Sequence, residues 1–184
     1  MSSVANKFYR IVDAYGIEKA AFEGQAWYPE AWDHCLNLSK QYGVSGQRVA
    51  AVLAVTSPRA RWGKNLEATY SIVADAFVAD YMRKSSYGIL GANARKGTQV
   101  MSDRYYSKLV TGEKVSAFYL NILGHTQPVT VDSIMSYAAG YGSDVSKKIR
   151  TEVTEACYSL ADVFSMTPRD TQAAVWIAYR GGAA

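Results

Sequence analysis

The chain has 184 residues and a formal net charge of +4 at pH 7, and its two cysteines, Cys35 and Cys157, are too few for a disulfide scaffold or an all-cysteine metal site. Hydrophobic residues make up 49% of the chain and charged residues 20%, which excludes a disordered or low-complexity protein. No apolar run reaches the about 20 residues that cross a bilayer, and the first residues carry no signal-peptide core, so we expect a cytoplasmic protein that does not enter a membrane.

Helical periodicity runs through the whole chain, and no stretch shows the sustained apolar–polar alternation that is typical of strands. Pro29 suits a helix start, Ser45 a helix cap, and Thr167-Pro168 the beginning of the last helix. A loop around residues 84–92 is a candidate separator of two helical lobes. We expect one all-α domain over residues 1–184, of roughly eight to ten short helices. The expected helices span about 4–15, 29–42, 45–55, 65–80, 93–106, 113–123, 131–141, 145–164 and 167–179.

The most informative pattern lies in residues 109–132. Thr111-Gly112 predicts a tight turn into a helix, whose unpaired backbone N–H groups suit a phosphate. Lys114 falls in the first turn of that helix, and Asp132 follows an extended segment at the start of the next helix. A helix, a short turn and an extended return can bring these two residues together as a nucleophile and its electrostatic partner.

This segment resembles the signature of the helix-hairpin-helix DNA glycosylases of the endonuclease III type. The matching parts are residues 111–114, the Gly/Pro turn at 124–128 and Val131-Asp132, and weaker similarity covers 53–65, 91–96 and 172–176. The chain differs at Val110, where the family has its first hairpin glycine, and at Ser133-Ile134, and it lacks the family's iron–sulfur cysteine cluster. The resemblance implies a glycosylase-like helical domain with a cleft between two helical lobes.

The resemblance also implies an enzyme that acts on a flipped damaged or modified base in DNA, with Lys114 and Asp132 as catalytic residues. The Asp132 carboxylate would stabilise positive charge on the sugar or help to activate a nucleophile. A nucleophilic Lys114 would form a Schiff base and nick the strand, whereas a Lys114 that only contacts phosphate or base would leave Asp132 to activate water. Taken singly, a lysine at a helix start is usually a surface residue and an aspartate there is usually a cap.

Three short segments are expected to bind DNA, since basic side chains neutralise phosphates and an aromatic can fill the place of a flipped base. The alternative for residues 57–65 is a solvated loop with its tryptophan packed inward. The expected DNA-binding residues are Arg59, Arg61, Trp62, Lys64, Arg95, Lys96, Thr111 and Gly112. The candidate substrate-pocket residues are Tyr119, Asn121 and His125. No metal or other cofactor is expected, because the neighbours His34-Cys35 have no second ligand cluster.

Two other functions fit the same residues. Some phage proteins that resemble this fold substitute an activated 5-hydroxymethyluracil in DNA, and the small size, altered hairpin and missing cluster agree with that group. A DNA-binding module without catalysis is the third possibility. In each case we expect DNA as the partner and a monomeric chain, located in the host cytoplasm if the source is viral.

Overall fold

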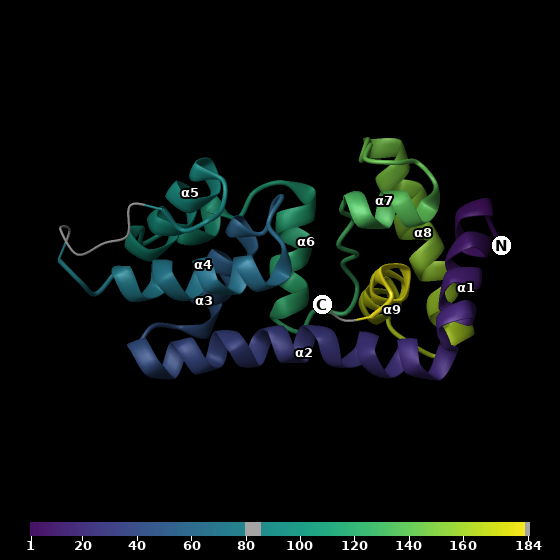
Figure 1. The fold of residues 1–184 in the computed structure, drawn as a ribbon, viewed down its shortest axis with the longest axis horizontal. Helices are drawn as coiled ribbons and strands as arrows, with labels where there is room; N and C mark the ends of the chain where they lie inside the picture. Colours follow the sequence, from purple (N-terminus) through teal and green to yellow (C-terminus); the bar gives the residue numbers. More distant parts are fainter. Residues whose placement is uncertain (80–85, 183–184) are drawn as a thin grey trace. The chain divides into compact units, whose positions relative to one another are not determined.

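The computed structural model describes residues 1–79 and 86–182, and these residues form nine α-helices and one 3₁₀ helix without any strand (Figure 1). The all-α prediction is therefore confirmed for this part of the chain. None of its helices combines the length and the apolar character that crossing a membrane requires. The chain divides into two compact units, unit 1 with Met1–Glu30 and Gly124–Ala184, and unit 2 with Ala31–Leu123.

Unit 1 packs four helices and the beginning of a fifth around one apolar core. These are α1 (Ser3–Tyr15), the first part of α2 (Ile17–Tyr42), α7 (Ser133–Ala139), α8 (Lys147–Phe164) and α9 (Pro168–Arg180). Phe8 of α1, Met135 of α7 and Leu160 of α8 are completely buried in this core. Burying side chains of this size supplies the main stabilisation of such a bundle.

Unit 2 is built around α3, which packs against α4, α5 and α6. Its elements are the end of α2, α3 (Gly46–Thr56), α4 (Trp62–Asp75), α5 (Gly91–Ser102), the 3₁₀ helix η2 (Tyr106–Leu109) and α6 (Glu113–Ile122). Every residue of α3 from 49 to 56 is buried, as expected for a helix that is apolar on all sides. Helix α5 comes close to this centre at Gly97, where an added Cβ would lie 3.0 Å from Thr56 Cγ2.

The prediction that a helix begins at Pro29 is wrong, because α2 is one helix of 26 residues with Pro29 inside it. Proline removes a backbone hydrogen bond and costs about 3 kcal/mol in a helix interior. A buried stripe nevertheless continues past it, from Ala20 and Tyr28 to Ala31 and Cys35, at helical spacing. Packing on both sides of the proline therefore offsets its local cost.

The predicted caps Ser45 and Thr167 are confirmed, since their side chains accept hydrogen bonds from backbone N–H groups at 3.2 Å in both cases. Several predicted boundaries are wrong by a few residues: α4 begins at Trp62, α5 ends at Ser102, and α7 is only seven residues long.

The prediction that the loop at 84–92 separates two lobes is also wrong, because both of its flanks belong to unit 2. Residues 80, 84 and 85 of the predicted segments lie outside the described residues. The boundaries between the units instead fall inside α2 and just after α6.

Gly24 tests the packing of α2 on α9 within unit 1. A Cβ at this position would lie 2.8 Å from both the Ala174 nitrogen and the Asp170 oxygen, so the two backbones would have to move apart. We predict that Gly24→Ala lowers the free energy of unfolding by about 1–3 kcal/mol, as overpacking does. Chemical denaturation measures this change.

Gly63→Ala is the matched control, because Gly63 lies in α4 with nothing within 4 Å of an added Cβ. Its unfolding free energy should stay unchanged or rise by up to about 1 kcal/mol, since alanine has the higher helix propensity. Equal effects at both glycines would contradict the close approach of α2 to α9.

Candidate nucleic-acid interface

A short basic loop, residues 57–61, joins α3 to α4 in unit 2. The Ser57 hydroxyl donates to the Ala54 oxygen at 2.9 Å, and the Ala60 nitrogen donates to the Ser57 oxygen at 3.1 Å, so the loop turns tightly. Arg59 takes a left-handed backbone conformation with φ 58°, which is uncommon for a residue other than glycine. The Arg59 and Arg61 side chains are exposed on this loop.

Helix α5 is bonded to this loop near its beginning. The Asn93 side-chain amide donates to the Pro58 oxygen at 2.7 Å. The exposed Arg95 lies two residues further along the same helix, beside Lys96. The basic loop and the basic turn of α5, which are distant in sequence, are therefore held next to each other.

Helix α5 also holds the turn Thr111-Gly112, here called the elbow, which leads into α6. The Lys96 ammonium donates to the Thr111 hydroxyl at 2.8 Å. Gly112 has φ 91°, a conformation that favours glycine, and its oxygen accepts from the Ser116 nitrogen at 2.9 Å. An added Cβ at Gly112 would meet nothing within 4 Å, so the backbone conformation and not crowding requires glycine here.

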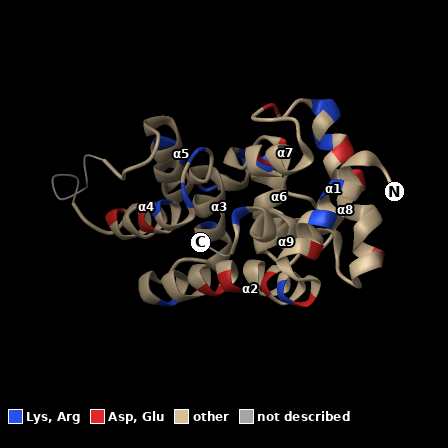
Figure 2. Cartoon of the chain, turned by 45° about the vertical axis from the view of Figure 1, so that its right-hand side comes forward, with Lys and Arg blue, Asp and Glu red and all other residues tan. Residues whose placement is uncertain are grey.

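Two hydrogen bonds thus hold the basic loop and the elbow against α5. Figure 2 shows where Lys and Arg (blue) and Asp and Glu (red) lie along the helices. Arg59, Arg61 and Arg95 form no ion pair with any residue that the structure describes. Counted from the sequence, unit 2 has twelve Lys and Arg against six Asp and Glu, a net of +6, whereas unit 1 has eight against ten, a net of −2. Unit 2 is therefore the basic part of the chain. Arg59, Arg61, Arg95 and Lys96 form the basic surface of unit 2.

Trp62 and Lys64 lie in α4, so the predicted basic loop is shorter than residues 57–65. Trp62 is half-buried and meets the His34 ring edge-on at 6.4 Å between centroids. Lys64 forms an exposed ion pair with Glu67 at 2.6 Å, which contributes little to stability. Trp62 is therefore a helix residue and not a loop residue, and its contact with DNA stays a prediction.

Sequence analysis did not single out three further basic residues around η2. Arg48 donates to the Val100 and Met101 oxygens at 3.0 and 2.7 Å, which fastens the end of α5 to α3. Arg104 and Lys108 are exposed and lie over the Tyr105 ring, 5.7 and 5.1 Å from its centroid. The available signal for Arg104 and Lys108 was that both flank the tyrosine pair Tyr105-Tyr106, whereas Arg48 had no local signal.

Asp132 is the cap of α7 in unit 1. Its Oδ1 accepts from the Met135 nitrogen at 3.0 Å, and its Oδ2 accepts from the Trp176 indole nitrogen at 3.2 Å. Trp176 in turn lies 5.9 Å from the Trp27 ring and carries the Arg180 guanidinium 4.6 Å above its own ring. The carboxylate is half-buried and fixed in orientation, a role for Trp176 that its spacing in the sequence did not reveal.

The other predicted catalytic residue, Lys114, is half-buried in the first turn of α6 in unit 2. Asp132 belongs to unit 1. Their pairing stays a prediction.

The predicted pocket residues also divide between the units. His125 is exposed in unit 1, whereas Asn121 in unit 2 is completely buried. Tyr119 is half-buried, and burial together with the neighbouring Tyr106 raises the pKa of its phenol to about 12. Tyr119 is therefore neutral near pH 7 and suits stacking or hydrogen bonding better than proton transfer.

No cluster of three or more His, Cys, Asp or Glu suited to a metal ion occurs among residues 1–79 and 86–182. Both cysteines are buried free thiols. Burial raises the pKa of Cys35 to about 12 and that of Cys157 further, so neither is a nucleophile near neutral pH.

A family model that is described as a family of unknown function, DUF7178, matches residues 3–183. The chain belongs to this family. No curated protein and no solved structure matches the chain.

The Asp132 cap has a measurable effect on stability. We predict that Asp132→Ala lowers the free energy of unfolding by about 0.5–2 kcal/mol, the usual cost of losing a cap of this kind. Asp132→Asn should lower the free energy of unfolding by less than Asp132→Ala does. Asparagine can still accept a hydrogen bond from the Met135 nitrogen, although it loses the bond from Trp176. Equal losses in both variants, measured by chemical denaturation, would contradict the cap assignment.

Proposed function

We propose that this chain is a DNA glycosylase-like enzyme that binds DNA through unit 2 and acts on a damaged or modified base. The observation that carries the proposal is that α5, which carries Arg95 and Lys96, is bonded to both the basic loop and the elbow, from Asn93 to Pro58 and from Lys96 to Thr111. Arg59, Arg61 and Arg95 are exposed and form no ion pair within residues 1–79 and 86–182, so binding them to phosphates breaks no ion pair there while it releases counterions from DNA.

The elbow supports the same proposal. Gly112, the N-cap of α6, has no side chain to cap the helix, and the beginning of a helix is a favourable place for a phosphate. A phosphate near Thr111 would also meet the Lys96 ammonium, which donates to the Thr111 hydroxyl. In our proposal the elbow and the basic surface contact one strand.

We assign the chemistry to the oriented carboxylate of Asp132. Glycosidic cleavage builds positive charge on the sugar, and a carboxylate whose direction is fixed by two N–H donors can stabilise that charge without reorganising. Lys114 is proposed as the amine that attacks the sugar or holds the phosphate beside it.

A DNA-binding module without catalysis is the second candidate, and one observation favours it. Both oxygens of Asp132 accept hydrogen bonds from partners within unit 1, as a purely structural cap would. The DNA-binding part of the proposal and its chemical part are therefore tested separately.

For DNA binding, we predict that replacing Arg59, Arg61 and Arg95 together by glutamine weakens duplex binding and flattens its salt dependence. Each lost phosphate contact should lower the slope of log K against log salt by about 0.9. Fluorescence anisotropy over a range of salt concentrations measures this slope.

The control removes the same number of positive charges from unit 1, by glutamine at the exposed residues Arg10, Lys147 and Lys148. This variant should keep most of the slope of the original chain. A DNA affinity that is independent of salt, or equal losses in the two triple variants, would refute binding through unit 2.

For the chemistry, we predict that incubation with DNA that carries damaged or hydroxymethylated bases releases a free base. Asp132→Asn should slow the release at least about 100-fold, as loss of a charge-stabilising group does, while DNA affinity stays within about twofold. Mass spectrometry of the nucleosides measures the release. Borohydride should trap a DNA adduct through Lys114 if the enzyme is also a lyase.

Other outcomes would assign the chain to the competing functions. A base of altered mass on an intact sugar would identify a hypermodification enzyme, such as one that substitutes an activated 5-hydroxymethyluracil. Unchanged nucleosides together with salt-dependent binding that Asp132→Asn leaves intact would identify a binding module.

A further inference from the structure

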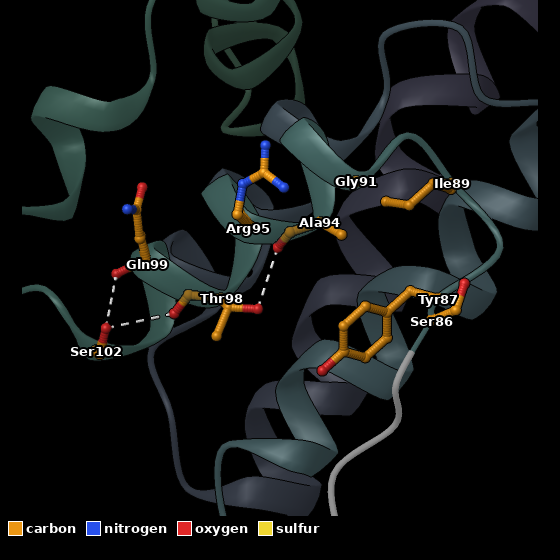
Figure 3. Close-up of a pocket in the computed structure, with 9 residues that line it drawn as sticks. All are labelled: Ser86, Tyr87, Ile89, Gly91, Ala94, Arg95, Thr98, Gln99 and Ser102. Atoms are coloured by element: carbon orange, nitrogen blue, oxygen red, sulfur yellow. Dashed lines mark hydrogen bonds between the residues drawn. The ribbon is translucent and has the colours of Figure 1, made fainter.

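A pocket of about 450 Å³ opens along α5 in unit 2, lined by residues that belong neither to the basic loop nor to the elbow. Tyr87 and Ile89 form one wall, on the segment that precedes α5, and Ala94 and Thr98 of α5 lie opposite them (Figure 3). This volume falls in the range of roughly 300–1,000 Å³ that small-molecule sites occupy.

The Tyr87 ring is fixed before any ligand arrives. Its phenol donates to Oδ2 of Asp75, a buried residue of α4, at 3.0 Å. Tyr87 and Thr98 also line an adjoining hollow of about 150 Å³ beside Asp75. An aromatic ring that is already fixed beside a pocket offers a flat apolar surface, and it loses little conformational entropy when a ligand binds.

The opposite part of the pocket carries positive charge. Arg95 is the one charged side chain among the described residues that line it, and it is exposed and forms no ion pair with them. In Figure 3 Ala94 lies between the Tyr87 ring and Arg95, whose side chain extends toward Gly91 at the beginning of α5. Neither Gly91 nor Ala94 carries a long side chain. The Thr98 hydroxyl already donates to the Ala94 oxygen at 3.1 Å, which leaves it as an acceptor for a ligand.

We propose that this pocket binds one nucleotide, with the base stacked on Tyr87 and the phosphate paired with Arg95. A planar base suits the tyrosine ring, because every nucleobase has a face that can stack. A phosphate is the anion that a guanidinium binds best through paired hydrogen bonds. The inference rests on the proposed function for the source of the nucleotide, which is an unpaired stretch of DNA bound by unit 2, and a free nucleotide offers the same chemistry.

Fluorescence of 2-aminopurine tests this inference on the full chain, because stacking on an aromatic ring quenches the probe. Three probes are titrated: 2-aminopurine deoxyriboside, its 5′-monophosphate, and a tetranucleotide with 2-aminopurine flanked by thymines. We predict saturable quenching of the monophosphate and the tetranucleotide. Tighter binding of the tetranucleotide would indicate a strand as the source, and tighter binding of the monophosphate a free nucleotide.

Variants separate the two contacts. Tyr87→Leu should weaken binding of the monophosphate roughly 5- to 100-fold, the usual effect of losing a base stack, whereas Tyr87→Phe should keep most of it. Arg95→Gln should weaken the monophosphate about two- to fivefold and leave the riboside unchanged, since only the phosphate carries charge. Tyr137→Leu, at a half-exposed tyrosine of α7, is the matched control without effect.

Absence of saturable quenching with all three probes would overturn the inference. So would monophosphate binding by the Tyr87→Leu and Arg95→Gln variants that is as tight as binding by the original chain. If Tyr87→Leu does not fold, the variant Arg95→Gln at an exposed residue still tests the pocket, by the difference between monophosphate and riboside binding. Loss of nucleotide binding while salt-dependent duplex binding stays intact would refute the nucleotide site in this pocket and leave the proposed function standing. Nucleotide binding without duplex binding would refute the proposed function and leave the pocket in place.

Discussion

Two hydrogen bonds from α5, one to the basic loop and one to the elbow, hold the candidate interface together. Asn93 holds the basic loop through the Pro58 oxygen, and Lys96 holds the elbow through the Thr111 hydroxyl. Gathering arginines in this way costs repulsion between like charges. The cost is sustained because α5 is itself anchored, through Gly97, against the buried helix α3. The packed core of unit 2 therefore holds these basic segments in place against the repulsion between their like charges.

Local sequence signals predicted most helices, and they failed where packing outweighs local preference. Ser45 and Thr167 could be identified from the sequence, because a cap is a property of three or four consecutive residues. Pro29 misled the prediction, since its usual place at a helix start hides a buried stripe on both sides of it. The division into two units could not be found either, because one of its boundaries lies inside a continuous helix.

The candidate site was predictable to a similar degree. Basic residues at 59, 61, 95 and 96 could be identified by composition, but their convergence depends on two hydrogen bonds between distant segments. Asp132 could be identified as a cap, whereas its bond to Trp176 joins residues 44 positions apart and has no local signature. The same fixed geometry serves a structural cap and an oriented carboxylate equally well, so chemistry at Asp132 must be decided by reaction products.

The central claim is that DNA contacts the chain through the segments gathered on α5. Hydrogen–deuterium exchange with mass spectrometry, in the presence and absence of duplex DNA, tests it most directly because it reports every segment at once. The account predicts slower exchange with DNA at residues 57–61, 91–99 and 109–116. Protection confined to unit 1, or no change in any segment at a DNA concentration that saturates binding, would contradict it.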